Sequence, residues 1–543
     1  MKRCILTLLL AVSICSSLYA QNNYKYWVQF TDKNNTPYSI DNPLEYLSQR
    51  AINRRAKFGI TIDSLDLPVN PAYVQAVAAT GATLINPSKW MNGVTVSLTD
   101  PDVASQIAAL PFVSRVDSVG IHYPQIDDYY GGGYESHTLT WNEEFSSDWY
   151  GYGYSQIRQL NGIKLHKAGF MGQGLWIGVV DGGFFNSDNL DIFQHLYDEG
   201  RVTATRNFVN PSDNNIYRYS DHGTMVLSTM AAFKPGFYVG TAPKAHFFLA
   251  VSEDSGNETI IEEYNLISAI EFFDSLGIDL VNMSLGYNRF DGDLFSYSHP
   301  QFDGQTAPSS RAADIAVAKG MLLVSSVGND GSEIFSVPAD ARHILSVGSV
   351  DREGDYSYFS TTGPTSDGRI KPDICAKGEL SVPACNGLIT WTSGTSFSSP
   401  VACGMTACVM QRYPTFAPDQ ICDSLRAWGD QADSPDNYRG YGIPNFGRSV
   451  DENHPHSSVD GPVSASLQFK LSPNPSRGQV TLFSAESQLD AVVSVYTLLG
   501  KKLYCGPVDD PATASTLSSL QQGIYLLRVI SSGNSQTLRM IRQ

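Results

Sequence analysis

The 543-residue sequence lacks the features that nucleic-acid binding and a permanent membrane span require. It has 37 lysine and arginine residues against 54 aspartate and glutamate residues, and its formal net charge is -17. Neutralising phosphates takes clusters of basic side chains, which are absent here, so we expect no nucleic-acid partner. Beyond the first 20 residues no segment offers about 18 uninterrupted apolar residues, so no permanent transmembrane segment is predicted.

Cysteine is also scarce, and its spacing excludes a metal site of the usual kind. The sequence holds eight cysteines, and none has the spacing of metal ligands, so no metal-binding residue is assigned. Cys403 and Cys408 lie five residues apart on an expected helix and are interpreted as core residues. Cys375 and Cys385 flank a loop, which gives the hypothesis of a disulfide in an oxidising compartment.

Residues 1–20 have the composition of a secretory signal peptide. Lys2 and Arg3 precede a short apolar segment that ends at Cys15, and the small residue Ala20 precedes a polar start. A lipid anchor on Cys15 is the alternative, and the bulky isoleucine before it argues against that reading. We therefore predict export from the cytoplasm and removal of these residues.

Composition and hydrophobic pattern divide the remaining chain into three modules and two linkers. Residues 21–120 mix strand and helix patterns and predict a small α+β, ferredoxin-like module, and residues 121–154, rich in Gly, Tyr and Ser, are typical of a linker. In residues 155–450, continuous apolar runs alternate with helical patterns. This predicts an α/β fold with a doubly wound, mostly parallel sheet and helices on both faces. Residues 451–466 form a second linker, and residues 467–543 predict a small antiparallel β-sandwich.

The stretch WTSGTSFSSPVACGMTA places hydroxyl residues directly before an expected buried helix, whose start we assign near its proline. In one interpretation Thr395, Ser396, Ser398 and Ser399 only cap the first turn of that helix. In the other, one serine is a nucleophile whose oxyanion would meet free N–H groups and the positive end of the helix dipole.

The order of catalytic residue types along the chain separates these interpretations. A serine nucleophile needs a histidine base, which in turn needs a carboxylate. An α/β-hydrolase is excluded, because Ser398 occupies the second glycine of its Gly-x-Ser-x-Gly motif and the only histidines after Ser396 lie in the second linker. The order acid, histidine, serine does find candidates. Asp181 follows the apolar run LWIGVV, and His222 begins an apolar helical segment.

These motifs resemble those of the subtilisin-type serine peptidases, the subtilases, over about residues 156–450. The matching blocks are VVDGGF at Asp181, HGT at His222, GTAPKA, VNMSLG, SVGN ending at Asn329, and GTSFSSP at Ser396. The resemblance implies that Ser396 is the nucleophile, His222 the general base and then acid, and Asp181 its orienting carboxylate. It also implies that the Asn329 amide contributes to the oxyanion hole.

The same resemblance implies a substrate-binding segment and an overall activity. Ser284, Leu285 and Gly286 match the segment that borders the S1 pocket and pairs with extended substrate backbone. Gly182 and Phe397 depart from the common residues at their positions, as does Ser398, but no catalytic atom is lost. We therefore expect a secreted serine endopeptidase that works through an acyl-enzyme. The alternative is a catalytically inactive subtilase-like protein that serves in surface binding or adhesion.

The flanking modules resemble parts that accompany such enzymes. Residues 21–120 resemble the inhibitory propeptides of subtilases, which implies an intramolecular inhibitor and cleavage within residues 121–154; a permanent accessory domain is the alternative. Residues 467–543 resemble the C-terminal sorting domains of type IX secretion; a cell-surface binding sandwich is the alternative.

These resemblances also imply partners and location. The expected partners are protein or peptide substrates, the chain's own propeptide and the type IX secretion machinery. The protein would be exported through the periplasm and secreted or held at the cell surface. No cofactor is expected to be required. Structural calcium stays open, because the acidic loop Asp188–Asp191 offers oxygen atoms but no site is assigned.

Overall fold

The structure is a computed structural model that describes residues 23–122, 149–291, 296–379, 384–385, 388–451, 469–484, 491–497, 501–508, 510–531 and 534–543. The chain has two compact units, residues 1–457 and 458–543. The predicted signal peptide and most of both predicted linkers lie outside the described residues. In the described part, no helix is long and apolar enough to cross a membrane.

The N-terminal module is an α+β fold with the expected ferredoxin-like strand order. Its antiparallel sheet has the order β2-β3-β1-β4. The elements are β1 (Asn23–Phe30), a 3-10 turn (Pro43–Glu45), α2 (Gln49–Phe58), α3 (Pro71–Ala78), β2 (Thr83–Ser88), β3 (Gly93–Leu98), α4 (Val103–Ala108) and β4 (Val113–His122). Val28, Val94 and Val96 are fully buried between this sheet and its helices, which gives the module its own core.

The central module contains a seven-stranded parallel sheet of order β13-β12-β11-β10-β5-β9-β6. Its strands are β5 (Trp176–Asp181), β6 (Val202–Asn207), β9 (His246–Val251), β10 (Leu280–Met283), β11 (Leu322–Ser326), β12 (Leu345–Val350) and β13 (Ile374–Lys377). The short antiparallel pairs are β7 (Phe233–Lys234) with β8 (Tyr238–Val239), and β14 (Ala384–Cys385) with β15 (Leu388–Ile389).

Helices cover both faces of this sheet, as predicted. The α-helices are α5 (Tyr154–Gln159), α6 (Gly162–Lys167), α7 (Gln194–Asp198), α8 (His222–Ala231), α9 (Ile261–Leu276), α10 (Pro308–Ala318), α11 (Thr395–Arg412) and α12 (Pro418–Ala427). The 3-10 turns are Ser187–Asn189, Asp191–Phe193, Ile216–Arg218, His299–Gln301 and Phe446–Val450. One core packs against α8 and α11, and the other against α9 and α10. Along β5, Ile177 and Val179 face the first core and Val180 faces the second, so the continuous apolar run is buried on both sides.

Helix α11 begins at Thr395, five residues before the start that we assigned from its proline, so that assignment was wrong. A proline inside a helix cannot donate to the carbonyl four residues earlier, which for Pro400 is that of Ser396. Here the Ser284 hydroxyl donates to the Ser396 carbonyl at 2.8 Å. A tertiary hydrogen bond thus replaces the one that proline removes, and the helix continues through Pro400.

The proposed disulfide between Cys375 and Cys385 is not formed. Cys375 is a free, fully buried thiol on β13, and its Sγ donates to the Arg439 carbonyl at 3.5 Å. Its position on a strand of the parallel sheet holds this side chain in the core. Cys403 and Cys408 are buried core residues, as predicted.

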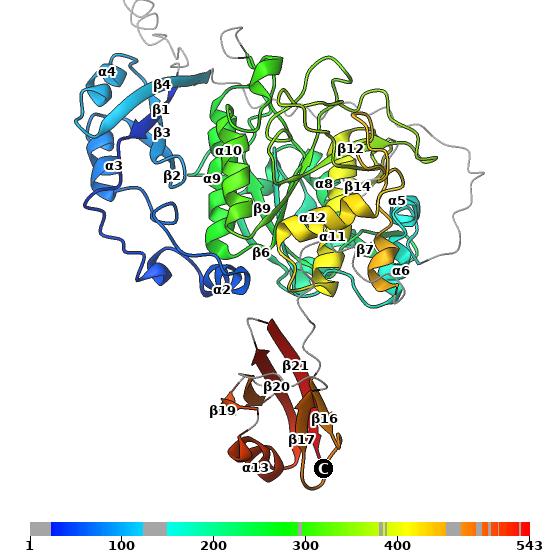
Figure 1. The fold of residues 1–543 in the computed structure, drawn as a ribbon. Helices are drawn as coiled ribbons and strands as arrows, with labels where there is room; N and C mark the ends of the chain where they lie inside the picture. The colour runs from blue at the N-terminus through cyan, green and yellow to red at the C-terminus, as the bar shows by residue number, and fades with distance from the viewer. Residues whose placement is uncertain are drawn as a thin grey trace, which may run out of the picture. The chain divides into compact units, whose positions relative to one another are not determined.

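The N-terminal module packs on α9 of the central module, and Figure 1 shows this blue module beside α9 and α10. The buried Asp274 of α9 accepts hydrogen bonds from three cations of the module, with N···O distances of 2.5 Å to Arg54, 2.8 Å to Arg55 and 2.8 Å to Lys89. Glu271, one turn earlier, accepts from the Ser88 hydroxyl and from two backbone N–H groups of the module. The contact is therefore largely electrostatic and almost fully buried.

A second part of the same contact is aromatic. The Trp27 ring stacks on Tyr264 of α9 with centroids 4.4 Å apart, and Trp27 is 1% exposed. Aromatic stacking and apolar burial add to the ionic contacts. The two parts of the interface together hold the module against the outer face of the helix layer.

The C-terminal unit is antiparallel, as predicted. A four-stranded sheet of order β19-β18-β20-β21 accompanies the pair β16-β17 around a small core that includes Val493, Leu527 and Val529. The elements are β16 (Phe469–Ser472), β17 (Thr481–Ser484), β18 (Val492–Thr497), β19 (Lys502–Pro507), α13 (Pro511–Ser519), β20 (Gly523–Ser531) and β21 (Asn534–Arg542). Helix α13 was not predicted, although Asp510 caps it in the usual way by accepting from the Ala512 N–H.

Candidate active site

Asp181 and His222 meet where the carboxyl end of β5 faces the start of α8. The His222 Nδ1 atom lies 2.8 Å from Asp181 Oδ1 and 3.0 Å from Oδ2. Because a carboxylate only accepts, this contact places the imidazole proton on Nδ1 and leaves Nε2 available as a base. Gly223 permits the close approach, since a Cβ there would lie 2.2 Å from the Gly183 carbonyl oxygen and 2.9 Å from the Asp181 Cβ.

The electrostatics of this pair favour the protonated imidazole. Burial lowers the pKa of His222, but the charge of Asp181 and the hydrogen bond to it outweigh burial and raise the pKa above its ordinary value of 6.5. The Asp181 carboxylate is 2% exposed and also accepts from the Gly182 N–H at 2.8 Å. His222 can therefore accept a proton as a base, because the fixed charge of Asp181 stabilises the imidazolium that forms.

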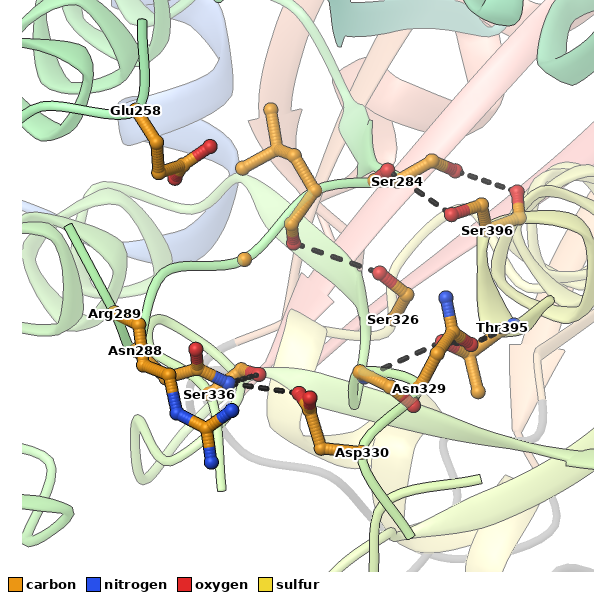
Figure 2. Close-up of a pocket in the computed structure, with 13 residues that line it drawn as sticks. Glu258, Ser284, Asn288, Arg289, Ser326, Asn329, Asp330, Ser336, Thr395 and Ser396 are labelled. Atoms are coloured by element: carbon orange, nitrogen blue, oxygen red, sulfur yellow. Dashed lines mark hydrogen bonds between the residues drawn. The ribbon is translucent and has the colours of Figure 1, made fainter. Parts of the chain in front are cut away.

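Ser396 lies on the first turn of α11, beside the same histidine. The rings of His222 and Phe397 have their centroids 5.9 Å apart, which places the imidazole at the helix start. Within the described residues the Ser396 hydroxyl donates to the Ser284 carbonyl at 3.3 Å and makes no hydrogen bond to His222. Ser284 therefore contacts Ser396 twice, through its carbonyl and through its hydroxyl (Figure 2).

Asn329 follows β11, and its amide orientation is fixed by Thr395. The Asn329 Oδ1 atom accepts from the Thr395 N–H at 2.9 Å and lies 3.0 Å from the Thr395 hydroxyl. Because Oδ1 is engaged, the Nδ2 donor is the end of the amide that remains directed at the pocket (Figure 2). The sequence interpretation named Asn329 but treated Thr395 only as a capping residue, so it missed the residue that orients the amide.

A pocket of about 330 Å³ adjoins Ser396. The described residues that line it are Glu258, Ser284, Leu285, Gly286, Asn288, Arg289, Ser326, Gly328, Asn329, Asp330, Ser336, Thr395 and Ser396. The substrate-binding segment expected from the resemblance, Ser284, Leu285 and Gly286, thus lies in the same pocket wall as the serine. Sequence reasoning missed Asn288, Asp330 and Ser336. In the sequence, only the positions of Asn288 and Asp330, shortly after the VNMSLG and SVGN motifs, could have pointed to them.

A second pocket of about 440 Å³ shares Glu258, Leu285 and Gly286 with the first and is otherwise lined largely by acidic residues. Burial raises the pKa of Glu258 to about 7, and the charge of Asp291 adds to the shift. The Tyr287 hydroxyl donates to the Glu253 carboxyl at 2.8 Å. The Leu285–Gly286 segment thus lines both pockets.

The described residues hold no group of three or more His, Cys, Asp or Glu side chains that could bind a metal ion. In the acidic loop Asp188–Asp191, Asp188 accepts from Asn189 at 2.9 Å and Asp191 pairs with Lys234 at 2.5 Å. These two carboxylates have protein partners, and no calcium site is assigned to the loop.

Three family models match the chain. One described as "Subtilase family" matches residues 172–442, one described as "Peptidase S8 propeptide domain, Bacteroidota" matches residues 25–127, and one described as "Secretion system C-terminal sorting domain" matches residues 470–543. The three resemblances expected from sequence motifs are therefore confirmed. The sorting domain indicates type IX secretion to the cell surface or exterior, as predicted.

Curated relatives and a solved structure agree with these matches. The chain is 29% identical over 319 residues to serine protease AprX of Bacillus subtilis, covering 51% of this chain and 66% of AprX. It is 27% identical over 303 residues to a thermostable alkaline protease of Halalkalibacterium halodurans, covering 54% and 72% of the two chains. For subtilisin E of B. subtilis the identity is 29% over 283 residues, covering 51% and 65%. The aligned regions thus span about two thirds of these relatives.

The epidermin leader peptide processing serine protease EpiP of Staphylococcus aureus shares the fold, with a TM-score of 0.53 at 15% identity over 79% of this chain and all of EpiP. Together with the parallel sheet and its helix layers, these matches decide the class. The chain belongs to the subtilase family of serine peptidases, with an S8 propeptide domain before the peptidase domain and a secretion sorting domain after it.

Proposed function

We propose that this protein is a secreted serine endopeptidase that hydrolyses peptide bonds of proteins through the triad Ser396, His222 and Asp181. The observation that carries the proposal is the 2.8 Å contact between His222 Nδ1 and Asp181, which leaves Nε2 free beside the helix turn that bears Ser396. A serine hydroxyl is a weak nucleophile until such a base removes its proton.

In the proposed reaction the Ser396 hydroxyl leaves the Ser284 carbonyl and turns to His222 Nε2. Its oxygen attacks the substrate carbonyl carbon while its proton passes to Nε2. The oxyanion formed accepts from the Asn329 Nδ2–H and from the Ser396 N–H at the positive end of α11. His222 then protonates the leaving amine, the C–N bond breaks and an acyl-enzyme ester remains. Water, deprotonated by His222, hydrolyses the ester, and no cofactor is required.

The N-terminal module is proposed to inhibit this site and to be released by cleavage within residues 121–154. Its last strand, β4, ends at His122, and a Cβ at Gly120 would lie 3.0 Å from Thr259, the neighbour of the pocket residue Glu258. The module therefore ends beside the pocket wall. In purified full-length protein, Ser396→Ala is expected to abolish trimming in this linker. Trimming at the wild-type rate would contradict self-processing.

The competing proposal is an inactive subtilase-like protein used for surface binding or adhesion. A fluorophosphonate probe labels only an activated serine, so it separates the two functions. We expect labelling of the wild type, loss of labelling in Ser396→Ala, and retained labelling in the matched control Ser398→Ala, whose hydroxyl donates within the helix to the Thr395 carbonyl. Equal labelling of Ser396→Ala and wild type, or none in processed protein, would favour the inactive protein.

A further inference from the structure

The pocket beside Ser396 is unusually polar for a site that would receive a substrate side chain. Of the lining side chains among the described residues, Leu285 alone is apolar, and the others carry hydroxyl, amide, carboxyl or guanidinium groups. Ligand pockets are usually lined mainly by apolar and aromatic side chains. A large apolar side chain placed here would remove these polar groups from water without offering them hydrogen bonds.

The end of the pocket distant from the serine is closed by Ser336, Asn288 and Asp330. Ser336 lies between the two backbone walls, since a Cβ at Gly286 would be 3.1 Å from its Cβ and a Cβ at Gly328 would be 2.6 Å from its Oγ. The Asn288 Nδ2 atom donates to Asp330 Oδ2 at 2.8 Å and lies 3.4 Å from the Ser336 Oγ (Figure 2). The floor therefore presents a hydroxyl and a carboxylate.

The charge of this floor is not balanced by the protein. Among the described residues Asp330 has no ion-pair partner, and its one side-chain donor is the neutral amide of Asn288. The nearby Arg289 pairs instead with Glu333 at 3.6 Å, and these two side chains are 61% and 76% exposed. Solvent screens so exposed a cation, so it neutralises Asp330 only weakly. Among the described lining residues Arg289 is the one cation, so Asp330 keeps its charge without a close counter-ion.

We propose that Asp330, with Ser336 and Asn288, selects a lysine or arginine side chain on the substrate residue whose carbonyl group is attacked by Ser396. This inference rests on the proposed peptidase function and names its substrate class. In this proposal the attacked carbonyl lies at Ser396 and Asn329, and the side chain of the same residue enters the pocket that these two residues line together with Asp330. A lysine or arginine then donates to the Asp330 carboxylate and the Ser336 hydroxyl, which are the groups its N–H donors require. Its aliphatic stem packs on Leu285.

The test uses the processed wild-type enzyme and fluorogenic peptides that differ only at the residue before the scissile bond, with Lys, Arg, Gln, Leu or Phe at that position. We expect kcat/KM for Lys and Arg to exceed that for Leu and Phe by about tenfold or more. In Asp330→Asn, kcat/KM for Lys and Arg should fall by about 10- to 100-fold, the usual effect of losing a charged hydrogen bond, while Leu and Phe change little. The introduced amide oxygen can still accept from Asn288, so the floor should stay folded.

The matched control is Glu353→Gln, which removes an exposed carboxylate that neither lines the pocket nor pairs with a lining residue, and it should alter neither group of substrates. A third variant, Ser336→Gly, should deepen the pocket and raise the Phe rate relative to the Lys rate. Preference of the wild type for Leu or Phe, or an equal loss on every peptide in Asp330→Asn, would overturn the inference and leave the peptidase function intact. Absence of any Ser396-dependent cleavage would overturn both.

Discussion

The substitution Asp274→Asn tests how the propeptide domain is held on the enzyme. Asp274 is fully buried on α9 and is the shared partner of Arg54, Arg55 and Lys89, whose side chains are 4%, 1% and 9% exposed. Asparagine keeps the size of the side chain and removes its charge. The three cations would then remain buried beside a neutral amide, and among the described ion pairs Arg55 alone of the three keeps a second carboxylate partner, that of Asp66.

The expected loss of docking free energy is large because the cations that remain are buried away from water. Removing one partner of a buried ion pair costs about 3 to 5 kcal/mol, since an uncompensated charge is left in the interior. That free energy corresponds to a factor of roughly 10² to 4 × 10³ in the equilibrium between docked and undocked propeptide domain. A solvent-exposed pair contributes only about 0 to 1 kcal/mol. The exposed pair Arg115–Asp117 of the same domain, with side chains 56% and 43% exposed, supplies the control Asp117→Asn.

The assay is urea titration of the full chain carrying Ser396→Ala, which prevents the proposed self-cleavage. Tryptophan fluorescence reports on undocking, because Trp27 and Trp90 are both buried in this contact region. Asp274→Asn should move the undocking transition to lower urea by the equivalent of about 3 to 5 kcal/mol, and Asp117→Asn by less than about 1 kcal/mol. Equal midpoints for the two variants would refute the reasoning.

The pH dependence gives the same prediction an independent check. Burial alone would raise the pKa of Asp274, but the charges of Lys89, Arg54 and Arg55 outweigh burial and hold the pKa far below its ordinary value of 3.8. A carboxyl with a lowered folded pKa stabilises the folded state fully above its unfolded pKa, and this contribution is lost as the pH falls below it. The difference in undocking free energy between wild type and Asp274→Asn should be constant near neutral pH and should shrink below about pH 4.

Three further predictions concern the catalytic site and the sorting domain. Asn329→Ala should lower kcat by about 10² to 10³, the range known for the corresponding subtilisin amide, with KM little changed, in peptide hydrolysis assays. Because Asp181 raises the pKa of His222, kcat/KM should fall as the pH drops through a value above 6.5. Asp181→Asn should move this acidic side of the pH–rate profile to lower pH, and an unchanged profile would contradict the assigned pair. Deleting residues 467–543 should leave the enzyme in the periplasm, as judged by immunoblots of cell fractions, and unaffected secretion would exclude a sorting role.

Local patterns predicted most of the fold. A strand that is buried on both faces, such as β5, can be predicted from its own residues, because a continuous apolar run indicates burial on both sides. The order of Asp181, His222 and Ser396 is also read from the chain alone, because chain order distinguishes the classes of serine hydrolase, and their catalytic roles stay a prediction. These features required no knowledge of which distant segments meet.

Local patterns failed where a distant residue replaced a local interaction. The start of α11 was misplaced because Ser284, 112 residues away along the chain, satisfies the carbonyl that Pro400 leaves unpaired. The disulfide hypothesis failed because it used only the position of the two cysteines at the ends of a loop, without the packing that buries Cys375 on β13. Thr395 was seen as a helix cap, although its N–H orients Asn329 across 66 residues of sequence.

The sequence by itself determined which elements form, in which order the catalytic residue types occur, and which modules precede and follow the peptidase domain. Only the tertiary structure decided that Asp330 and Asn288, 42 residues apart, close one pocket together with Ser336, and that Asp274 receives three cations of the propeptide domain. The physical reason is that periodicity and capping act over a few residues. Charge balance and pocket shape instead depend on side chains that meet only after the sheet and its helices have packed.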